Sequence, residues 1–296
     1  MGGGGVSGEL FVFGLGYSAR AFVERARGRY RRIGGTVRTA EKAAALRAEG
    51  IAAVVFDGGA PSPAVTAALR TATHLLVSVA PGAADPVLAA HGEAIAAAPA
   101  LEAIVYLSTV GVYGDHGGGW VDEATPPAPK SVRSIERVAA ETAWTALGRA
   151  TGVPVALLRL AGIYGPRRNA LADLAAGTAR RLVKPGQVFN RIHVEDIAAA
   201  IDAAFAARAD GPVNVCDDAP SAPQDVVAFA AGLMGVPPPP ETDFATADLS
   251  PMARSFYGEN KRVSNRRLRE HLGVDLAHPS YREGLTALWR SGRWRG

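Results

Sequence analysis

Short apolar runs alternate with helix-forming stretches along most of the chain. The apolar runs cover residues 9–14, 32–38, 51–56, 74–79, 104–108, 153–160 and 212–215. The segments with the composition of helices cover residues 17–27, 41–49, 64–69, 87–98, 131–148 and 193–207. Apolar runs this short are typical of strands that are buried on both faces of a parallel sheet. The alternation therefore predicts right-handed βαβ units and an α/β fold with a doubly wound parallel sheet.

A glycine motif follows the first predicted strand directly. The strand runs into Gly14-x-Gly16-x-x-Ala19, and a helix-like pattern comes next. In such a motif the first glycine permits a sharp turn, the second lets the backbone approach a pyrophosphate, and a small third residue lets helix and strand pack closely. The pyrophosphate would lie at the helix N-terminus, where N–H groups and the helix dipole favour an anion. An ordinary strand–helix turn in a Gly-rich chain could carry the same letters. The position after a strand at the chain start favours a Rossmann-type dinucleotide site.

The end of the second strand indicates which dinucleotide is bound. An acidic side chain there binds the ribose 2′-hydroxyl of NAD, whereas a cationic one accepts the 2′-phosphate of NADP. Here the strand ends in Arg38 and Thr39, and no acid occurs before Glu41. Arg38 therefore favours NADP over NAD, although a solvated arginine at a strand end remains an alternative. Asp57, after the third strand, could accept from the adenine amino group or could simply form a turn.

Composition and charge limit the classes of partner. The chain has 296 residues, of which 48% are hydrophobic and 20% charged, enough for one large domain or a domain with a lobe. The net charge of 32 − 28 = +4 indicates a mild attraction for anionic small molecules. No nucleic-acid reader motif accompanies this charge, so nucleic acid is not an expected partner.

Cysteine usage and hydropathy indicate the compartment. Cys216 is the single cysteine, which excludes an intrachain disulfide and a cysteine-based metal site. No apolar run approaches the ~20 residues of a membrane span. Met1 and the four glycines after it lack the basic start of a signal peptide. We therefore expect a cytoplasmic protein with no membrane partner.

Four later segments carry a resemblance to a known family. Residues 106–115 read Tyr-Leu-Ser-Thr-Val-Gly-Val-Tyr-Gly-Asp, residues 158–166 Leu-Arg-Leu-Ala-Gly-Ile-Tyr-Gly-Pro, residues 192–198 Ile-His-Val-Glu-Asp-Ile-Ala, and residues 213–215 Val-Asn-Val. In this order and spacing they resemble the extended short-chain dehydrogenase/reductases, the family of sugar-nucleotide epimerases and dehydratases. The resemblance runs from residue 9 to about residue 285.

The resemblance implies a two-part organisation. Residues 1–165 would form the Rossmann domain, to which the chain returns at about 190–216. Residues 166–189 and 217–296 would form a smaller C-terminal lobe that binds a small-molecule substrate. Pairing into a homodimer is a weaker expectation from the same resemblance.

The chain departs from the family at the catalytic helix. The family uses a hydroxyl on strand five, here Thr109, and a Tyr-x-x-x-Lys on the next helix. Anchoring on Ala140-Glu141 places Arg133 at the Tyr position and Arg137 at the Lys position; a shift of one residue gives Val132 and Glu136. Neither register supplies a tyrosine. A guanidinium cannot replace a phenol as proton donor, so ~10²–10⁴-fold of acid–base help would be missing. The chain thus resembles the atypical branch that lacks this tyrosine.

Few side chains could substitute for the tyrosine. His116 lies beside Asp115 just after strand five and could exchange a proton near neutral pH, although an exposed loop histidine is the simpler interpretation. Tyr113 and Tyr164 match positions that the family carries for packing and pocket lining, and either could be the working acid. Ser108 lies outside a Gly-x-Ser-x-Gly context, which argues against a hydrolase. His193-Val-Glu-Asp196 is typical of a structural helix start, and we predict no metal.

These observations lead to one favoured function and one alternative. We expect an NADP-binding oxidoreductase or epimerase-like enzyme that acts on a small carbonyl or hydroxyl substrate with a non-standard proton donor. The alternative is a catalytically degenerate NAD(P)-binding sensor or regulatory protein. Arg137 could still hold the nicotinamide ribose or a phosphate. The expected cofactor contacts are Gly14, Gly16, Tyr17, Ser18, Ala19, Arg38, Thr39, Asp57, Val79, Ala80, Ser108 and Arg137.

Overall fold

The computed structural model describes residues 8–296, except for the side chains of residues 252 and 253. Residues 1–7, on which part of the localisation argument rests, lie outside the described part. The chain divides into two compact units, which are described separately. Unit 1 comprises Met1–Thr109, Val132–Arg159 and Ala198–Val213, and unit 2 comprises Val110–Ser131, Leu160–Ile197 and Asn214–Gly296.

Unit 1 is built on a seven-stranded parallel sheet. Its strands are β1 (Glu9–Phe13), β2 (Arg32–Val37), β3 (Ala52–Val55), β4 (His74–Val77), β5 (Ala103–Thr109), β7 (Val155–Leu160) and β11 (Gly211–Val215). They lie in the order β11-β7-β5-β4-β1-β2-β3. The order reverses between β1 and β4, which is where doubly wound sheets bind ligands. The predicted α/β fold with a Rossmann-type doubly wound sheet is confirmed.

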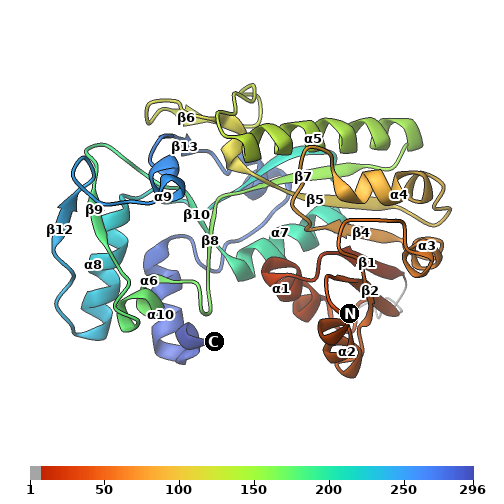
Figure 1. The fold of residues 1–296 in the computed structure, drawn as a ribbon, viewed down its shortest axis with the longest axis horizontal. Coiled ribbons are helices and arrows are strands. Elements are labelled where there is room, and N and C mark those ends of the chain that lie inside the picture. Colours follow the sequence, from red (N-terminus) through yellow and green to blue (C-terminus); the bar gives the residue numbers. More distant parts are fainter. Residues whose placement is uncertain (1–7) are drawn as a thin grey trace. The chain divides into compact units, whose positions relative to one another are not determined.

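Helices cover both faces of this sheet (Figure 1). They are α1 (Tyr17–Ala26), α2 (Ala40–Ala48), α3 (Pro63–Leu69), α4 (Pro86–Ala96), α5 (Val132–Thr151) and α7 (Val194–Ala206), of which α7 begins in unit 2. On one face α1 contacts α7 through Phe22 and Phe205, whose rings lie 5.8 Å apart. On the other face Tyr106 of β5 contacts Trp144 of α5 at 5.9 Å. The predicted ranges of these elements agree with the observed ones to within three residues.

The apolar sequence runs are buried because both faces of the sheet are covered. Phe11 and Phe13 of β1 lie in the core cluster that includes Trp144, whereas Val12 between them points to the opposite face. Each of these side chains is at most 2% exposed. Burial of one such side chain contributes about 1.5–3 kcal/mol to folding.

A buried ion pair joins helix α5 to two strands. The Glu141 carboxylate accepts from Arg159 of β7 at 3.1 Å (Nε) and 2.7 Å (Nη2), and the Ser108 hydroxyl of β5 donates to it at 2.5 Å. The two charged side chains are only 6% and 5% exposed. These three contacts hold α5 against the sheet and fix its position along the strands.

Unit 2 consists of short strand pairs and packed helices. Its elements are η1 (Val110–Tyr113), β6 (Trp120–Val121), β8 (Gly162–Tyr164), α6 (Ala170–Ala175), β9 (Arg181–Val183), β10 (Arg191–His193), α8 (Pro223–Met234), β12 (Glu241–Asp243), α9 (Pro251–Phe256), β13 (Arg262–Val263), η2 (Arg267–His271), α10 (Tyr281–Ser291) and η3 (Arg293–Arg295). Three parallel pairs form, β10–β8, β12–β9 and β13–β6. Helices α6, α8 and α10 pack on one another around Leu171, Ala230 and Leu285.

The short strands of unit 2 were not expected from the sequence. The apolar runs that predict strands include no residue between 161 and 211 and none after 215, so β9, β12 and β13 are additions that only the structure shows. A strand of two or three residues is too short to show a periodic pattern. Its existence depends on a partner strand that is distant in the sequence.

Removing the carboxylate charge of Glu141 should destabilise the protein. Glu141→Gln leaves the Arg159 guanidinium buried without its counter-charge, and we expect the free energy of unfolding to fall by about 3–5 kcal/mol. Urea unfolding followed by circular dichroism measures the change. Glu49→Gln is the matched control, because Glu49 also binds an arginine, Arg20, at two nitrogens but is 39% exposed. Glu49→Gln should lower the free energy of unfolding by no more than about 1 kcal/mol. Equal decreases in the two variants would contradict the prediction.

Candidate functional site: a nucleotide edge in unit 1 and a cationic pocket in unit 2

The turn after β1 can be made only with glycine at position 14. Gly14 has φ +85°, and a Cβ there would lie 3.0 Å from Val79 Cγ2 and 3.2 Å from the Ser78 carbonyl group. Its N–H donates to Thr36 Oγ1 at 2.9 Å, and the Leu15 N–H donates to the Thr36 carbonyl at 2.9 Å. The turn is therefore held between the ends of β2 and β4.

The N-terminus of α1 is open to an anion. Gly16 is the N-cap residue, no side chain caps this end, and the first turn carries no acidic residue. A Cβ at Gly16 would meet no atom within 4 Å, so the backbone faces open space. Ala19 and Ser18 are buried on the inner side of the helix, and Tyr17 is half-buried. Anions bind at such helix ends through N–H groups and the helix dipole.

The carboxyl ends of β2 and β3 carry the residues assigned to the adenosine half. Arg38 is exposed, and no hydrogen bond or ion pair joins its guanidinium to another described residue. The Thr39 hydroxyl caps helix α2 by accepting from the Lys42 N–H at 3.3 Å. Asp57 is exposed and accepts from the Gly59 N–H at 3.0 Å, which is the turn-forming role. Ala80 is exposed beyond the end of β4.

Strand β5 and helix α5 carry the residues assigned to the nicotinamide half. Thr109 is half-buried at the end of β5. The Arg137 guanidinium donates from Nη1 to the Tyr106 hydroxyl at 2.9 Å and to the Leu107 carbonyl at 2.8 Å. Arg133 is exposed one turn earlier. The Ser108 hydroxyl donates to Glu141 and is therefore occupied, which leaves the main chain of Ser108 for a contact with a cofactor. The position that the sequence assigns to the family lysine therefore holds an arginine whose guanidinium is hydrogen-bonded to strand β5.

The three proposed proton donors lie in unit 2 in different environments. Tyr113 is fully buried, and its hydroxyl donates to Asn214 Oδ1 at 2.7 Å. Tyr164 is 8% exposed, its hydroxyl donates to the Ser280 carbonyl at 3.2 Å, and burial raises its pKa well above the usual range. His116 is half-buried with Nε2 3.1 Å from the Tyr113 carbonyl. The burial of both tyrosines argues for packing roles and against proton transfer.

The carboxylate next to His116 is engaged elsewhere. Asp115 Oδ1 accepts from the Gly117 N–H at 3.1 Å and the Asn260 N–H at 2.8 Å, and Lys130 lies 3.6 Å away. These contacts lower the Asp115 pKa, the backbone bonds contributing most. Asp115 therefore fixes the loop to residue 260 and does not pair with His116.

Unit 2 contains a cationic pocket that the sequence did not reveal. It has a volume of about 450 Å³, and three arginines are among the residues that line it; of these, Arg191 also donates from Nη1 to the Phe189 and Ser221 carbonyls. Its lining residues are Ile163, Tyr164, Arg167, Arg168, Asn169, Ala170, Asp173, Arg191, Pro223, Val226, Val227, Tyr281 and Leu285. Arg167 has φ +65°, a conformation that is rare for arginine. The only sequence signal was a pair of arginines directly after Tyr164-Gly-Pro166.

A buried acid, Asp217, contacts one of the pocket's arginines, because its N–H donates to the Arg191 carbonyl at 2.7 Å. Asp217 is 2% exposed, its Oδ1 accepts from the Ala219 N–H at 3.1 Å, and its Oδ2 has no partner among the described residues. Burial raises its pKa to about 7, partly offset by the Ala219 bond and the charge of Arg191. Burial also lowers the pKa of Arg191. At neutral pH this acid is close to its midpoint of ionisation.

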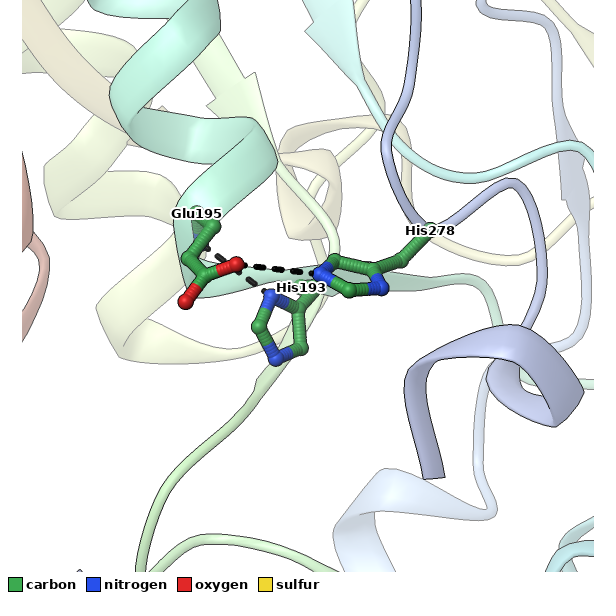
Figure 2. Close-up of side chains that lie close together, drawn as sticks. All are labelled: His193, Glu195 and His278. Carbon is green, nitrogen blue, oxygen red and sulfur yellow. Dashed lines mark hydrogen bonds and ion pairs between the residues drawn. The ribbon is translucent and has the colours of Figure 1, made fainter. Parts of the chain in front are cut away.

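The His193-Val-Glu-Asp196 segment meets a second histidine in the structure. Asp196 holds the loop before α10 by accepting from the Ala277 N–H at 2.7 Å and the His278 N–H at 3.1 Å. His278 Nε2 lies 3.1 Å from Glu195 Oε2, as Figure 2 shows. The His278 contact lowers the Glu195 pKa to about 2, and burial lowers the His193 pKa to about 4. The segment starts helix α7 as expected, but the approach of His278 was missed.

A family model decides the classification. Residues 87–216 match the model of the NAD dependent epimerase/dehydratase family. This segment belongs to the NAD dependent epimerase/dehydratase family. The resemblance to extended short-chain dehydrogenase/reductases is thereby confirmed. A search of curated proteins found no match.

Solved structures share the fold over nearly the whole chain. A protein from Silicibacter pomeroyi, described as functionally unknown and conserved, is 49% identical with a TM-score of 0.87, covering 97% of this chain and 100% of its own. A protein from Methylobacillus flagellatus, described as a putative NAD-dependent epimerase/dehydratase, is 25% identical with a TM-score of 0.74, covering 97% of this chain and 99% of its own. UDP-glucose 4-epimerase from Thermus thermophilus, in complex with NAD, is 22% identical with a TM-score of 0.76 over 97% and 99%. The last likeness shows the fold alone.

Among the described residues, no helix has the length and hydropathy to cross a membrane.

Adding a methyl group at Gly284 should destabilise unit 2. A Cβ at this position of α10 would overlap the Tyr164 hydroxyl and ring. We expect Gly284→Ala to lower the free energy of unfolding by about 1–3 kcal/mol, the usual effect of overpacking. Gly232→Ala in α8 is the control, because a Cβ there meets no atom within 4 Å. The control should be neutral or stabilising by about 0.5–1 kcal/mol. A neutral Gly284→Ala would show that Tyr164 is not held where the structure places it.

The buried acid should make stability depend on pH. The Asp217 pKa is raised from 3.8 to about 7, so the folded state keeps a proton that the unfolded state loses between these values. Its contribution to stability is present below about pH 4 and falls as the pH rises to about 7, by up to about 1.4 kcal/mol per pH unit. Asp217→Asn should therefore match the wild type at low pH and exceed it at pH 8. Asp218→Asn, at an exposed neighbour bound to Arg269, should show no such gain. Parallel pH profiles for Asp217→Asn and the wild type would refute the assignment.

Proposed function

We propose that this protein is an NADP-binding oxidoreductase or epimerase-like enzyme that acts on a small carbonyl or hydroxyl substrate. The observation that carries the cofactor choice is Arg38. This arginine is exposed at the carboxyl end of β2, and the open helix end after Gly16 belongs to the neighbouring β1–α1 turn. A cation at this strand end suits the 2′-phosphate of NADP.

The magnitude of the preference follows from the contact. A hydrogen bond between an arginine and a phosphate is charge-assisted and contributes about 1.5–3 kcal/mol. That difference corresponds to roughly a tenfold to hundredfold preference for NADP over NAD. The nearest acid in sequence, Glu41, lies in the first turn of α2 and is not at the strand end where a ribose 2′-hydroxyl would be bound.

The cofactor, when bound, supplies a site that accepts or donates hydride. In this proposal the Thr109 hydroxyl orients the carbonyl or hydroxyl group of the substrate. Arg137, already fixed to β5, presents a permanent positive charge to a ribose or phosphate oxygen. His116 is the side chain that exchanges the proton, because Tyr113 and Tyr164 are buried and bonded to other groups.

The pocket in unit 2 supports an anionic substrate. Arg167, Arg168 and Arg191 line it together with one acid, Asp173, whose pKa is raised by burial. A volume of about 450 Å³ lies in the range of small-molecule sites. The aromatic ring of Tyr281 and the aliphatic side chains on its wall suit a ligand with a flat or apolar part. A cytoplasmic location belongs to the same proposal.

A sensor without redox turnover is the second candidate. It is favoured by the arginines that stand where the family has tyrosine and lysine. Both candidates bind NADP(H), and only the enzyme consumes it in the presence of a substrate. Oxidation of NADPH followed by its absorbance, with a panel of carbonyl compounds that carry phosphate or carboxylate groups, separates the two.

Cofactor preference should follow the charge at position 38. NADPH should raise the melting temperature more than NADH at equal concentration, because a ligand that binds only the folded state stabilises it. Arg38→Asp should reverse this order, since a carboxylate repels the phosphate and accepts from a ribose hydroxyl. Arg32→Asp is the matched control, because Arg32 is exposed at the opposite end of the same strand. An unchanged order in Arg38→Asp, or a reversal by the control, would remove Arg38 from this role.

A further inference from the structure

Three side chains of unit 2 lie close together, outside the cationic pocket and outside the glycine turn and strand ends that are assigned to the nucleotide. His193 ends β10, Glu195 lies in the first turn of α7, and His278 lies in the loop before α10. We propose that they form a binding site for one divalent transition-metal ion, Zn²⁺ in particular. The proposal does not depend on the assigned cofactor or reaction.

The ligand atoms are already close to the spacing that zinc requires. One nitrogen from each histidine and one oxygen of Glu195 all lie within 4.8 Å of one another, and the His278 Nε2 to Glu195 Oε2 distance is 3.1 Å. Zinc binds at about 2.0–2.2 Å from nitrogen and oxygen in a tetrahedron, which separates its ligands by about 3.3–3.5 Å. Figure 2 shows the three side chains turned toward a common point. Side-chain shifts of about one ångström would complete the site.

One hydrogen bond of His193 fixes a ligating tautomer. The Glu195 N–H donates to His193 Nδ1 at 3.3 Å, so Nδ1 carries a lone pair and the proton lies on Nε2. Nε2 is buried and has no partner among the described residues. A buried N–H without a partner costs about 1–3 kcal/mol, and ligation through Nδ1 leaves this N–H as it is. Ligation replaces only the long hydrogen bond from the Glu195 N–H, so the ion has little to displace at His193.

The backbone around the cluster is held independently of any ion. The Asp196 carboxylate accepts from the N–H groups of Ala277 and His278, which ties the loop before α10 to the start of α7. His193 and Glu195 are separated by one residue at the β10–α7 junction. The three ligands therefore come from two segments that are already joined. A site on such a scaffold loses little conformational freedom when it binds an ion.

The charges around the proposed site determine the expected affinity for the metal ion. Glu195 is the single anion among the three ligands, and Arg293 donates to its other oxygen, Oε1, at 3.0 Å. Arg293 leaves Oε2 to the ion but competes for the carboxylate charge. Three protein ligands leave a fourth position for water. We therefore expect a moderate affinity that rises when Arg293 is removed, a response that a His278–Glu195 hydrogen bond without a metal role would not give.

Isothermal titration calorimetry with ZnCl₂ tests the proposal. The full chain, without a histidine tag, is treated with EDTA and dialysed against metal-free buffer. We expect one ion per chain, with the affinity reduced at least about tenfold in His278→Ala and in Glu195→Gln. Arg293→Ala should tighten binding roughly two- to fivefold. His271→Ala is the matched control, because His271 is exposed on η2 outside the cluster, and its affinity should be unchanged.

Titration with CoCl₂ gives a second readout, because tetrahedral Co²⁺ bound by these ligands absorbs visible light and the hydrated ion absorbs weakly. Absence of saturable binding to the wild type would overturn the proposal. So would equal affinity in the wild type and Glu195→Gln, or a loss of affinity in His271→Ala alone. If His278→Ala fails to fold, Glu195→Gln and Arg293→Ala decide, since both of these side chains are substantially exposed, at 43% and 61%.

Discussion

The buried contact between Glu141 and Arg159 is the interaction on which the candidate site of unit 1 depends. It crosses from α5 to β7, and the Ser108 hydroxyl extends it to β5. A buried carboxylate and guanidinium stabilise the fold only while both remain, because either alone would be an uncompensated buried charge. The contact therefore fixes the position of α5 along the sheet. With α5 fixed, Arg137 reaches the Leu107 carbonyl of β5 and lies one turn from Glu141.

Backbone geometry, more than side-chain chemistry, determines the form of the glycine turn that is proposed to bind the nucleotide. Gly14 adopts a positive φ and lies where a Cβ would press on Val79 and Ser78, while Gly16 leaves the start of α1 uncovered. These features suit any dinucleotide. In the proposed NADP site, the side chain at the end of β2 makes the choice between NAD and NADP, and Arg38 is exposed there. The proposal thus assigns binding to a rigid glycine turn and discrimination to an exposed arginine.

The polar chemistry of unit 2 is concentrated in buried groups. Tyr113 and Tyr164 donate to acceptors inside the unit, Asp217 has a pKa raised by burial, and His193 carries a buried N–H without a partner among the described residues. Burial of the tyrosines makes a phenol a poor substitute for the missing family tyrosine. It leaves cationic groups, the arginines that line the pocket, as the side chains that a small anion would meet.

The sequence by itself determined the elements of the sheet, the glycine turn, the family and the charge at position 38. Each of these depends on a local feature of the sequence, such as an apolar run, the spacing of a few residues or a single side chain at a strand end. The tertiary structure alone decided that Tyr113 is buried against Asn214, that three arginines line one pocket and that His278 meets Glu195. It also decided the strands β9, β12 and β13, each of two or three residues. These features arise from residues far apart in the chain, so no local pattern records them and only packing brings them together.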